Sequence, residues 1–150
     1  MQSVTSLVIS LLVVKFMLQT NLRTGPLGVP HGITSCIMCP AVMKYNFKHA
    51  DGNRDILAKQ KTIQDILWSE PEVVRALREA GLNRATTDLG DSLDAIIRAL
   101  GLPRSLSEMG IDLEVLPKLS KRTLDDIWAA TNPVPLVKAE QVQEILEMVV

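Results

Sequence analysis

The chain has 150 residues, a net charge of −1 and 47% hydrophobic residues, which is enough apolar material for one domain with a buried core. This composition excludes a largely disordered chain, and the lack of a basic run excludes a nucleic-acid-binding surface, which needs clustered Lys and Arg. Aromatic residues make up only 3%, so the core must be built from Leu, Ile, Val, Ala and Met. Such a core suits packed helices better than a β-sandwich, which favours aromatic and β-branched strands.

The first 24 residues contain a nearly continuous apolar run, from residue 4 to residue 18, that is interrupted by Lys15. A membrane span needs about 20 apolar residues, so this run is a marginal candidate. A signal peptide is not indicated, because residues 1–6 carry no Lys or Arg. Three alternatives stay open: a buried helix, a mistaken gene start, and a membrane anchor through residues 4–18.

From residue 31 onward, after a Gly/Pro turn at 25–30, apolar residues recur at helical spacing. No alternating strand pattern follows, so the sequence predicts an all-α helical bundle. Pro40 should kink the first helix, since proline lacks an N–H donor and crowds the preceding turn. The expected apolar stripes are Ile33, Ile37 and Ala41; Ile56, Ile63, Ile66 and Leu67; Val73, Val74, Leu77 and Ala80; Leu93, Ile96, Ile97 and Leu100; Leu116, Leu119, Leu124 and Ile127; and Val142, Ile145, Leu146 and Val149.

Capping residues predict where two of these helices begin. Ser69 and Glu72 have the spacing of a capping box, in which each side chain accepts from a backbone N–H of the first turn. Ser92 is the expected N-cap of the helix that follows the loop at 83–90. Glycines at 81 and 101 should end the third and fourth helices, because glycine adopts the left-handed conformation after a last turn.

The most informative stretch is Gly-Pro-Leu-Gly-Val-Pro-His-Gly-Ile-Thr-Ser-Cys at 25–36, followed by Pro40 and by Tyr45-Asn46. It resembles the second signature of the iron-containing alcohol dehydrogenase family, where a Pro-His-Gly turn leads into a helix that ends near a Tyr-Asn or Phe-Asn pair. Further resemblances follow in order: AIIRALGLP at 95–103, LSEMGI at 106–111 and LDDIWAATNP at 124–133. The ILW at 66–68 and the Thr-Ser after Pro-His-Gly lie nearest the maleylacetate reductase-like branch.

This resemblance implies that residues 25–150 form the all-helical C-terminal domain of that family, a fold of the dehydroquinate synthase-like type. Residues 1–24 are then an apolar segment that does not match. The implied function is that of a fragment of a metal-dependent, NAD(P)-linked oxidoreductase, an alcohol dehydrogenase or maleylacetate reductase-like enzyme. Such enzymes transfer hydride between a nicotinamide and the alcohol or carbonyl carbon of a small molecule, with iron (or zinc) and NAD(P) as cofactors.

By the same resemblance His31 is a metal ligand. Without it, His31 would be interpreted as a turn histidine that caps the following helix. The family's site uses one Asp and three His, and the slots of the two histidines on the preceding helix fall at Leu18 and Leu22, which cannot ligate. The chain also shows no G-x-G-x-x-G phosphate loop after a strand. We therefore expect it to bind neither metal nor nucleotide tightly alone, and not to act alone.

The alternative function is that of a non-catalytic helical fragment or pseudoenzyme that serves only as an interaction module. Its partner would be a second copy, forming a homo-oligomer, or a complete family member. Activity with added nicotinamide and metal separates this alternative from an enzyme.

Two cysteines, Cys36 and Cys39, have the spacing of a redox motif. Because both fit the apolar face of a predicted helix, we expect buried core residues instead. Two cysteines are too few for a disulfide-rich secreted scaffold, so a reducing compartment, the cytoplasm, is the expected location.

Four other polar residues are candidates for chemistry. His49 lies in a polar loop, where we expect it to be solvated. Asp125 and Asp126 could act as paired carboxylates, but a solvated helix face is the expected role. Asn132 precedes a proline and should lie in a turn at a helix end, with a structural role first and substrate contact second.

Overall fold

The computed structural model describes residues 29–125 and 129–150. Within these ranges all regular secondary structure is helical and there is no strand, which confirms the predicted all-α class. The α-helices are α2 (His31–Lys48), α3 (Arg54–Leu67), α4 (Pro71–Glu79), α5 (Leu89–Ala99), α6 (Leu116–Thr123) and α7 (Ala139–Glu147). Three short 3-10 segments join them: η1 (Ser107–Met109), η2 (Leu113–Val115) and η3 (Ala129–Thr131).

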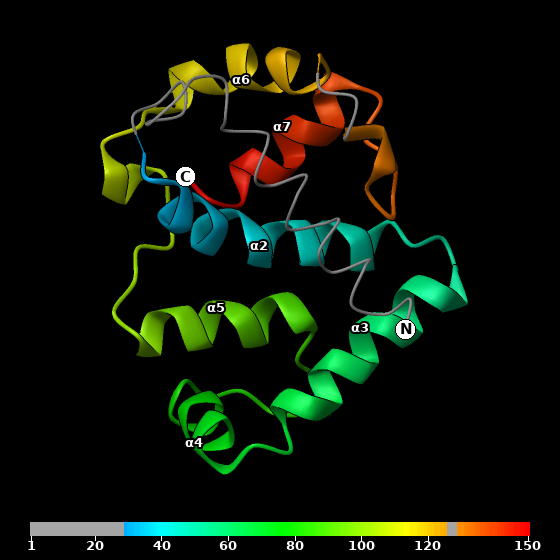
Figure 1. The fold of residues 1–150 in the computed structure, drawn as a ribbon, viewed down its shortest axis with the longest axis vertical. Helices are drawn as coiled ribbons and strands as arrows, with labels where there is room; N and C mark the ends of the chain where they lie inside the picture. Colours follow the sequence, from blue (N-terminus) through cyan, green and yellow to red (C-terminus); the bar gives the residue numbers. More distant parts are fainter. Residues whose placement is uncertain (1–28, 126–128) are drawn as a thin grey trace.

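Helix α2 is the centre of the bundle. It packs against α5 on one side and against α7 on the other. Figure 1 shows α6, α7, α2, α5 and α4 stacked one after another, with α3 running obliquely from the end of α2 toward α4. Every other helix is therefore positioned relative to α2, directly or through one intermediate helix.

Two hydrophobic cores lie on either side of the α2–α5 contact. The first joins α2, α6 and α7, and its fully buried members include Met38, Val42 and Val142. The second joins the end of α3 with α4 and α5, and consists of Trp68, Leu77 and Ala95 with partly buried neighbours. Burying one such large apolar side chain contributes roughly 1.5–3 kcal/mol to folding, so the first and larger core contributes most of the stability.

Gly90 lets α5 approach α2 closely. A Cβ atom at this position would lie 2.6 Å from the backbone carbonyl oxygen of Pro40 and would also collide with the side chain of Lys44. Helix α2 continues through Pro40 as one element, and the carbonyl of this proline faces the start of α5. A side chain at position 90 would force the two helices apart.

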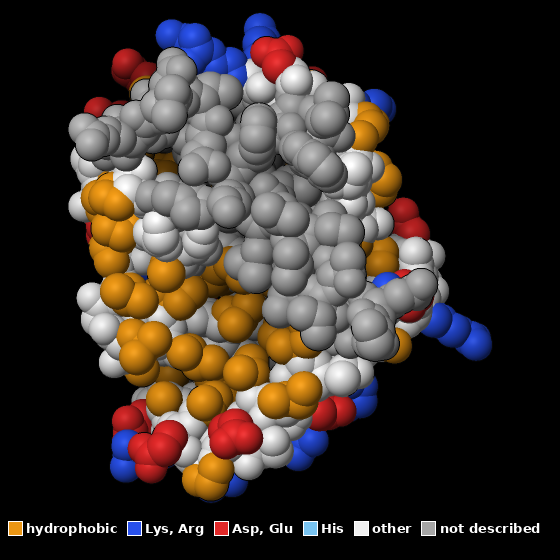
Figure 2. All heavy atoms as spheres, in the orientation of Figure 1, with side chains coloured by type: hydrophobic (Ala, Val, Ile, Leu, Met, Phe, Trp, Pro, Cys, Tyr) orange, Lys and Arg blue, Asp and Glu red, His pale blue; other side chains and the backbone are white. Residues whose placement is uncertain are grey.

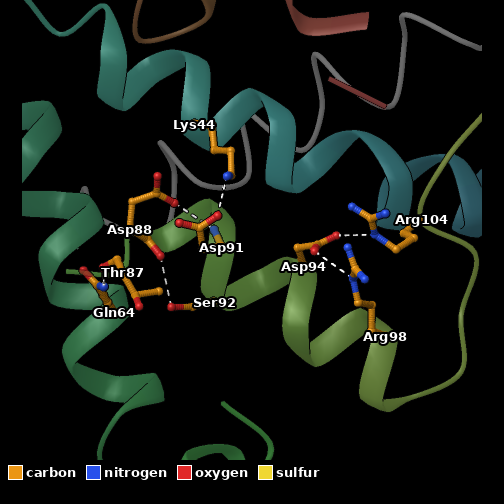
Figure 3. Close-up of polar contacts among 9 residues, drawn as sticks. All are labelled: Lys44, Gln64, Thr87, Asp88, Asp91, Ser92, Asp94, Arg98 and Arg104. Atoms are coloured by element: carbon orange, nitrogen blue, oxygen red, sulfur yellow. Dashed lines mark hydrogen bonds and ion pairs between the residues drawn. The ribbon is translucent and has the colours of Figure 1, made fainter. Parts of the chain in front are cut away.

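One ion pair joins the same two helices, and two more involve α5 and the loop that follows it (Figure 3). Lys44 on α2 forms an ion pair with Asp91 on α5. One turn further along α5, Asp94 accepts hydrogen bonds from Arg98 Nε at 3.0 Å and from Arg104 Nε, in the loop after α5, at 2.7 Å. These half-exposed pairs contribute modestly to stability, and they fix the loop after α5 against the helix.

The predicted capping box at Ser69 is wrong. The N-cap of α4 is Glu70, which makes no side-chain capping bond, and Pro71 occupies the first turn. Ser69 Oγ instead donates to the carbonyl oxygen of Ile66 at 2.7 Å, at the end of α3. Proline needs no hydrogen-bond acceptor at the first position of a helix, so this helix can begin without the serine.

The predicted N-cap at Ser92 is also wrong, because α5 begins one turn earlier. Asp88 is the N-cap, and its Oδ1 accepts from the backbone N–H of Asp91 at 2.7 Å. Ser92 lies inside the helix and its Oγ donates to the carbonyl oxygen of Asp88 at 3.0 Å. The predicted helix ends at Gly81 and Gly101 are confirmed, with φ of +77° and +68°.

The predicted apolar stripes hold best on the last helix, where Val142, Ile145, Leu146 and Val149 are all buried. They fail at helix ends: Ile66, near the end of α3, is 56% exposed, and Leu100, directly after α5, is 67% exposed. The predicted Ile127 lies outside the described residues.

No helix in the described ranges is long and apolar enough to cross a membrane. The predicted anchor at residues 4–18 lies outside those ranges.

Candidate functional site

The Pro30-His31-Gly32 turn forms the start of α2, as the sequence predicts. Pro30 is the N-cap residue with φ −57° and ψ 140°, and its carbonyl oxygen accepts from the backbone N–H of Thr34 at 3.1 Å. The helix begins at His31 itself. The structure describes the backbone of His31 but not its side chain, so its role as a ligand stays a prediction.

Buried residues fix this turn on both sides. Val29, just before it, is 5% exposed and belongs to the first core. Thr34, one turn later, is 1% exposed, and its Oγ1 has no hydrogen-bond partner within the described part of the chain. The backbone of His31 is therefore held between two points that packing keeps in place.

The metal implied by the resemblance does not find a complete site in the described residues. Nowhere in 29–125 or 129–150 do three or more His, Cys, Asp or Glu side chains come together in a group that could hold a metal ion. The positions expected to lack ligands, Leu18 and Leu22, lie outside the described residues, as does the side chain of His31. His31 thus stands as one possible ligand, without a described partner ligand.

The two cysteines lie on α2, after the turn that holds His31. Both Cys36 and Cys39 are free thiols, and both are half-buried, so the expectation of core residues holds in part. Burial raises the pKa of the Cys39 thiol to about 11, and the neighbouring Cys36 adds to the effect. A thiol with so high a pKa is a poor nucleophile, which disfavours a redox role for this pair.

The Tyr45-Asn46 pair near the end of α2 has a structural role. Tyr45 is buried, and its hydroxyl accepts from Gln141 Nε2 on α7 at 3.1 Å. Asn46 and Asn132 exchange two hydrogen bonds, at 3.2 and 2.6 Å, and Asn132 Nδ2 also donates to the carbonyl oxygen of Val134 at 2.6 Å. The predicted structural role of Asn132 is confirmed: it ties the turn before α7 to α2.

The expectation that His49 is simply solvated is wrong. Its Nε2 lies 2.9 and 3.0 Å from the two carboxylate oxygens of Glu144 on α7, and its ring packs on Tyr45 with 4.4 Å between ring centroids. Lys48 Nζ also reaches Glu144, at 2.7 Å. Hydrogen bonds from Lys48 and then His49 lower the pKa of Glu144 below its ordinary value. These contacts join the end of α2 to α7.

The structure describes only one of the two predicted paired carboxylates. Asp125 is exposed, as predicted for a solvated face, and Asp126 lies outside the described residues.

A cavity of about 370 Å³ runs along the middle of α2, between this helix, α5 and the C-terminal residues. Its apolar wall includes Ile37 and Val149, and its charged wall includes Lys44, Asp94 and Arg104. All three charges are already paired: Lys44 pairs with Asp91 on α5, and Asp94 pairs with Arg104 in the loop after α5. We therefore interpret this cavity as a gap in the packing between helices and not as a second reaction site.

The chain is a helical bundle built around α2, and α2 begins at the Pro30-His31-Gly32 turn. These features are those of the helical domain of a known enzyme family. Over residues 18–150 the chain matches the Fe-containing alcohol dehydrogenase family, C-terminal, and it belongs to that family. The match begins at residue 18, whereas the motif resemblance starts at 25, so the domain boundary after residue 24 stays a prediction.

Three relatives illustrate the match. The chain is 40% identical over 126 residues to Dehydrogenase FUM7 of Gibberella moniliformis, covering 84% of the chain and 29% of FUM7. It is 40% identical over 124 residues to Dehydrogenase ALT3 of Alternaria alternata (83% and 32%), and 30% identical over 112 residues to lactaldehyde reductase of Escherichia coli strain K12 (72% and 26%). The chain thus spans between 26% and 32% of the length of these relatives. No solved structure matched the chain.

Proposed function

We propose that the chain supplies the helical domain of a metal-dependent, NAD(P)-linked dehydrogenase. The reaction is hydride transfer between a nicotinamide and the alcohol or carbonyl carbon of a small molecule. The observation that supports the proposal is the Pro30-His31-Gly32 turn at the start of the buried central helix, in a chain of this family. The names of the three relatives, two dehydrogenases and one reductase, are consistent with it.

In this proposal His31 is one imidazole ligand of an iron or zinc ion, and the other ligands come from outside the described residues. When bound, the metal polarises the oxygen of the alcohol or carbonyl group. The chain's own contribution is position: packing of Val29 and Thr34 holds the backbone of His31 at one end of α2. Within the family we favour the maleylacetate reductase-like branch, on the ILW at 66–68 and the Thr-Ser after the turn.

A graft tests the proposal. Residues 29–150 replace the matching segment of the E. coli lactaldehyde reductase, and reduction of lactaldehyde is followed with NADH and with NADPH. We expect activity in the graft and a loss of more than about 100-fold in His31→Ala, since removing even a residue that supports a ligand costs 10–100-fold. His49→Ala is the matched control, because this histidine contacts Glu144 instead. Equal activity of the graft and its His31→Ala variant would exclude His31 as a ligand.

The second candidate function is the interaction module. The observation that favours it is a set of large apolar side chains left in solvent: Leu100 is 67% exposed, Val137 62% and Leu113 61%. In Figure 2, hydrophobic side chains also gather in the middle of the visible face, over α5 and the edge of α2. Sedimentation of the chain, alone and mixed with a complete family member, tests this function. A chain that stays monomeric in both cases contradicts it.

A further inference from the structure

A second cavity, of about 350 Å³, lies where the end of α3, helix α4 and the loop between α4 and α5 meet. In Figure 1 this corner is at the α4 end of the stack, with α5 between α4 and α2. The volume is at the small end of the range for sites that bind small molecules. The lining residues are Trp68, Val74, Arg78, Leu82, Asn83 and Arg84.

Trp68 lines this cavity, and its side chain carries a hydrogen-bond donor without a partner among the described residues. The residue is only 8% exposed, and its indole Nε1–H is buried without an acceptor in the described part of the chain. Buried indole N–H groups are normally paired, since desolvation without a hydrogen bond is unfavourable. Because this nitrogen has almost no accessible surface, the indole ring forms the cavity wall, and the donors to a ligand must come from other lining residues.

The remaining polar groups of the lining favour an anion. Arg78 and Arg84 carry positive charge, and no acidic side chain is among the described lining residues. Arg84 Nη2 donates to Asp65 at 2.8 Å, which leaves its other N–H groups for a second acceptor. Arg78, in the last turn of α4, forms no ion pair with any described residue. The fork of a guanidinium group matches the two oxygens of a carboxylate.

The apolar residues of the lining indicate that the ligand also has an apolar part. Val74 and Leu82 both line the cavity and belong to the second core, so they are fixed by packing. Inorganic phosphate would leave this wall unused, whereas an organic acid would cover it. We propose that the cavity binds a small organic acid with a short aliphatic body. Arg78 and Arg84 are the donors to its carboxylate, and the indole ring of Trp68 forms part of the wall.

This site is separate from the His31 turn, so it stands whether or not the proposed dehydrogenase function holds. Trp68 is itself the probe. The full chain contains one other tryptophan, Trp128, and a Trp128→Phe variant leaves Trp68 as the only indole fluorophore. Titration of this variant with hexanoate should give a saturable change in emission. Hexanol, which has the same body without the charge, and inorganic phosphate should each bind at least about tenfold more weakly.

Two arginine variants on α4 complete the test. Arg78→Gln should weaken hexanoate binding at least about tenfold, because it removes one charged donor. Arg75→Gln is the matched control, since Arg75 lies on the same helix but pairs with Glu72 and does not line the cavity. Calorimetry on the unmodified chain gives the same comparison without Trp128→Phe. The proposal is overturned by no saturable hexanoate binding, by hexanol or phosphate binding as well as hexanoate, or by an unchanged affinity in Arg78→Gln.

Discussion

Replacing Gly90 with alanine should destabilise the protein, although Gly→Ala changes in helices usually do the opposite. At an ordinary helical position the change stabilises by up to about 1 kcal/mol, because alanine has the higher helix propensity. Gly90 differs because a Cβ atom there would lie 2.6 Å from the carbonyl oxygen of Pro40, where ordinary contact begins at 3.4 Å. The overlap is with backbone, which cannot rotate away, so α5 must move.

The magnitude follows from that overlap. Extra atoms forced into a packed contact cost about 1–3 kcal/mol, and displacement of α5 also strains the Lys44–Asp91 ion pair. We therefore expect Gly90→Ala to lower the free energy of unfolding by about 1–3 kcal/mol. This free energy is measured by urea denaturation followed by circular dichroism.

Gly32→Ala is the matched control. Gly32 is also near the start of a helix, but a Cβ atom there would meet no atom of the described residues within 4 Å. This variant should be as stable as the parent or slightly more stable. A Gly90→Ala protein as stable as Gly32→Ala would refute the close approach of α5 to α2.

Three further predictions concern polar groups. Asn132→Ala should lower the free energy of unfolding by about 1–3 kcal/mol in urea denaturation, because it leaves the buried Asn46 amide unpaired; an unchanged midpoint would contradict this. The lowered pKa of Glu144 means that its bonds to Lys48 and His49 stabilise the protein above pH 4.5, and that this contribution is lost as the pH falls through the lower folded pKa. The stability difference from Glu144→Gln should therefore shrink on acidification, and a difference independent of pH would be the contrary result. Cys39, with a pKa raised from 9.0 to about 11, should carry about 100-fold less thiolate at mildly alkaline pH than an ordinary thiol, so a thiol reagent should label it slowly until the protein unfolds.

The helices could be predicted from apolar residues at helical spacing, and the agreement is complete at the last helix, where Val142, Ile145, Leu146 and Val149 are all buried. Their ends were harder to predict. Ser92 and Asp88 are both good N-caps, and only the position of α5 against α2 decides between them.

Contacts between distant residues could not be predicted. His49 and Glu144 are 95 residues apart, and nothing near His49 in the sequence indicates its partner. The buried donor of Trp68 likewise depends on how α4 packs against α3 and α5. By contrast, the Pro30-His31-Gly32 turn was located correctly as the start of a helix, since proline before a helix and the order of the motif are local features.

The metal content of the graft into lactaldehyde reductase tests the central claim, that His31 is a metal ligand, most directly. Elemental analysis of the purified graft should find about one iron or zinc per chain, and His31→Ala should reduce it at least about tenfold, while His49→Ala leaves it unchanged. A His31→Ala graft that folds and keeps its full metal content would contradict the claim.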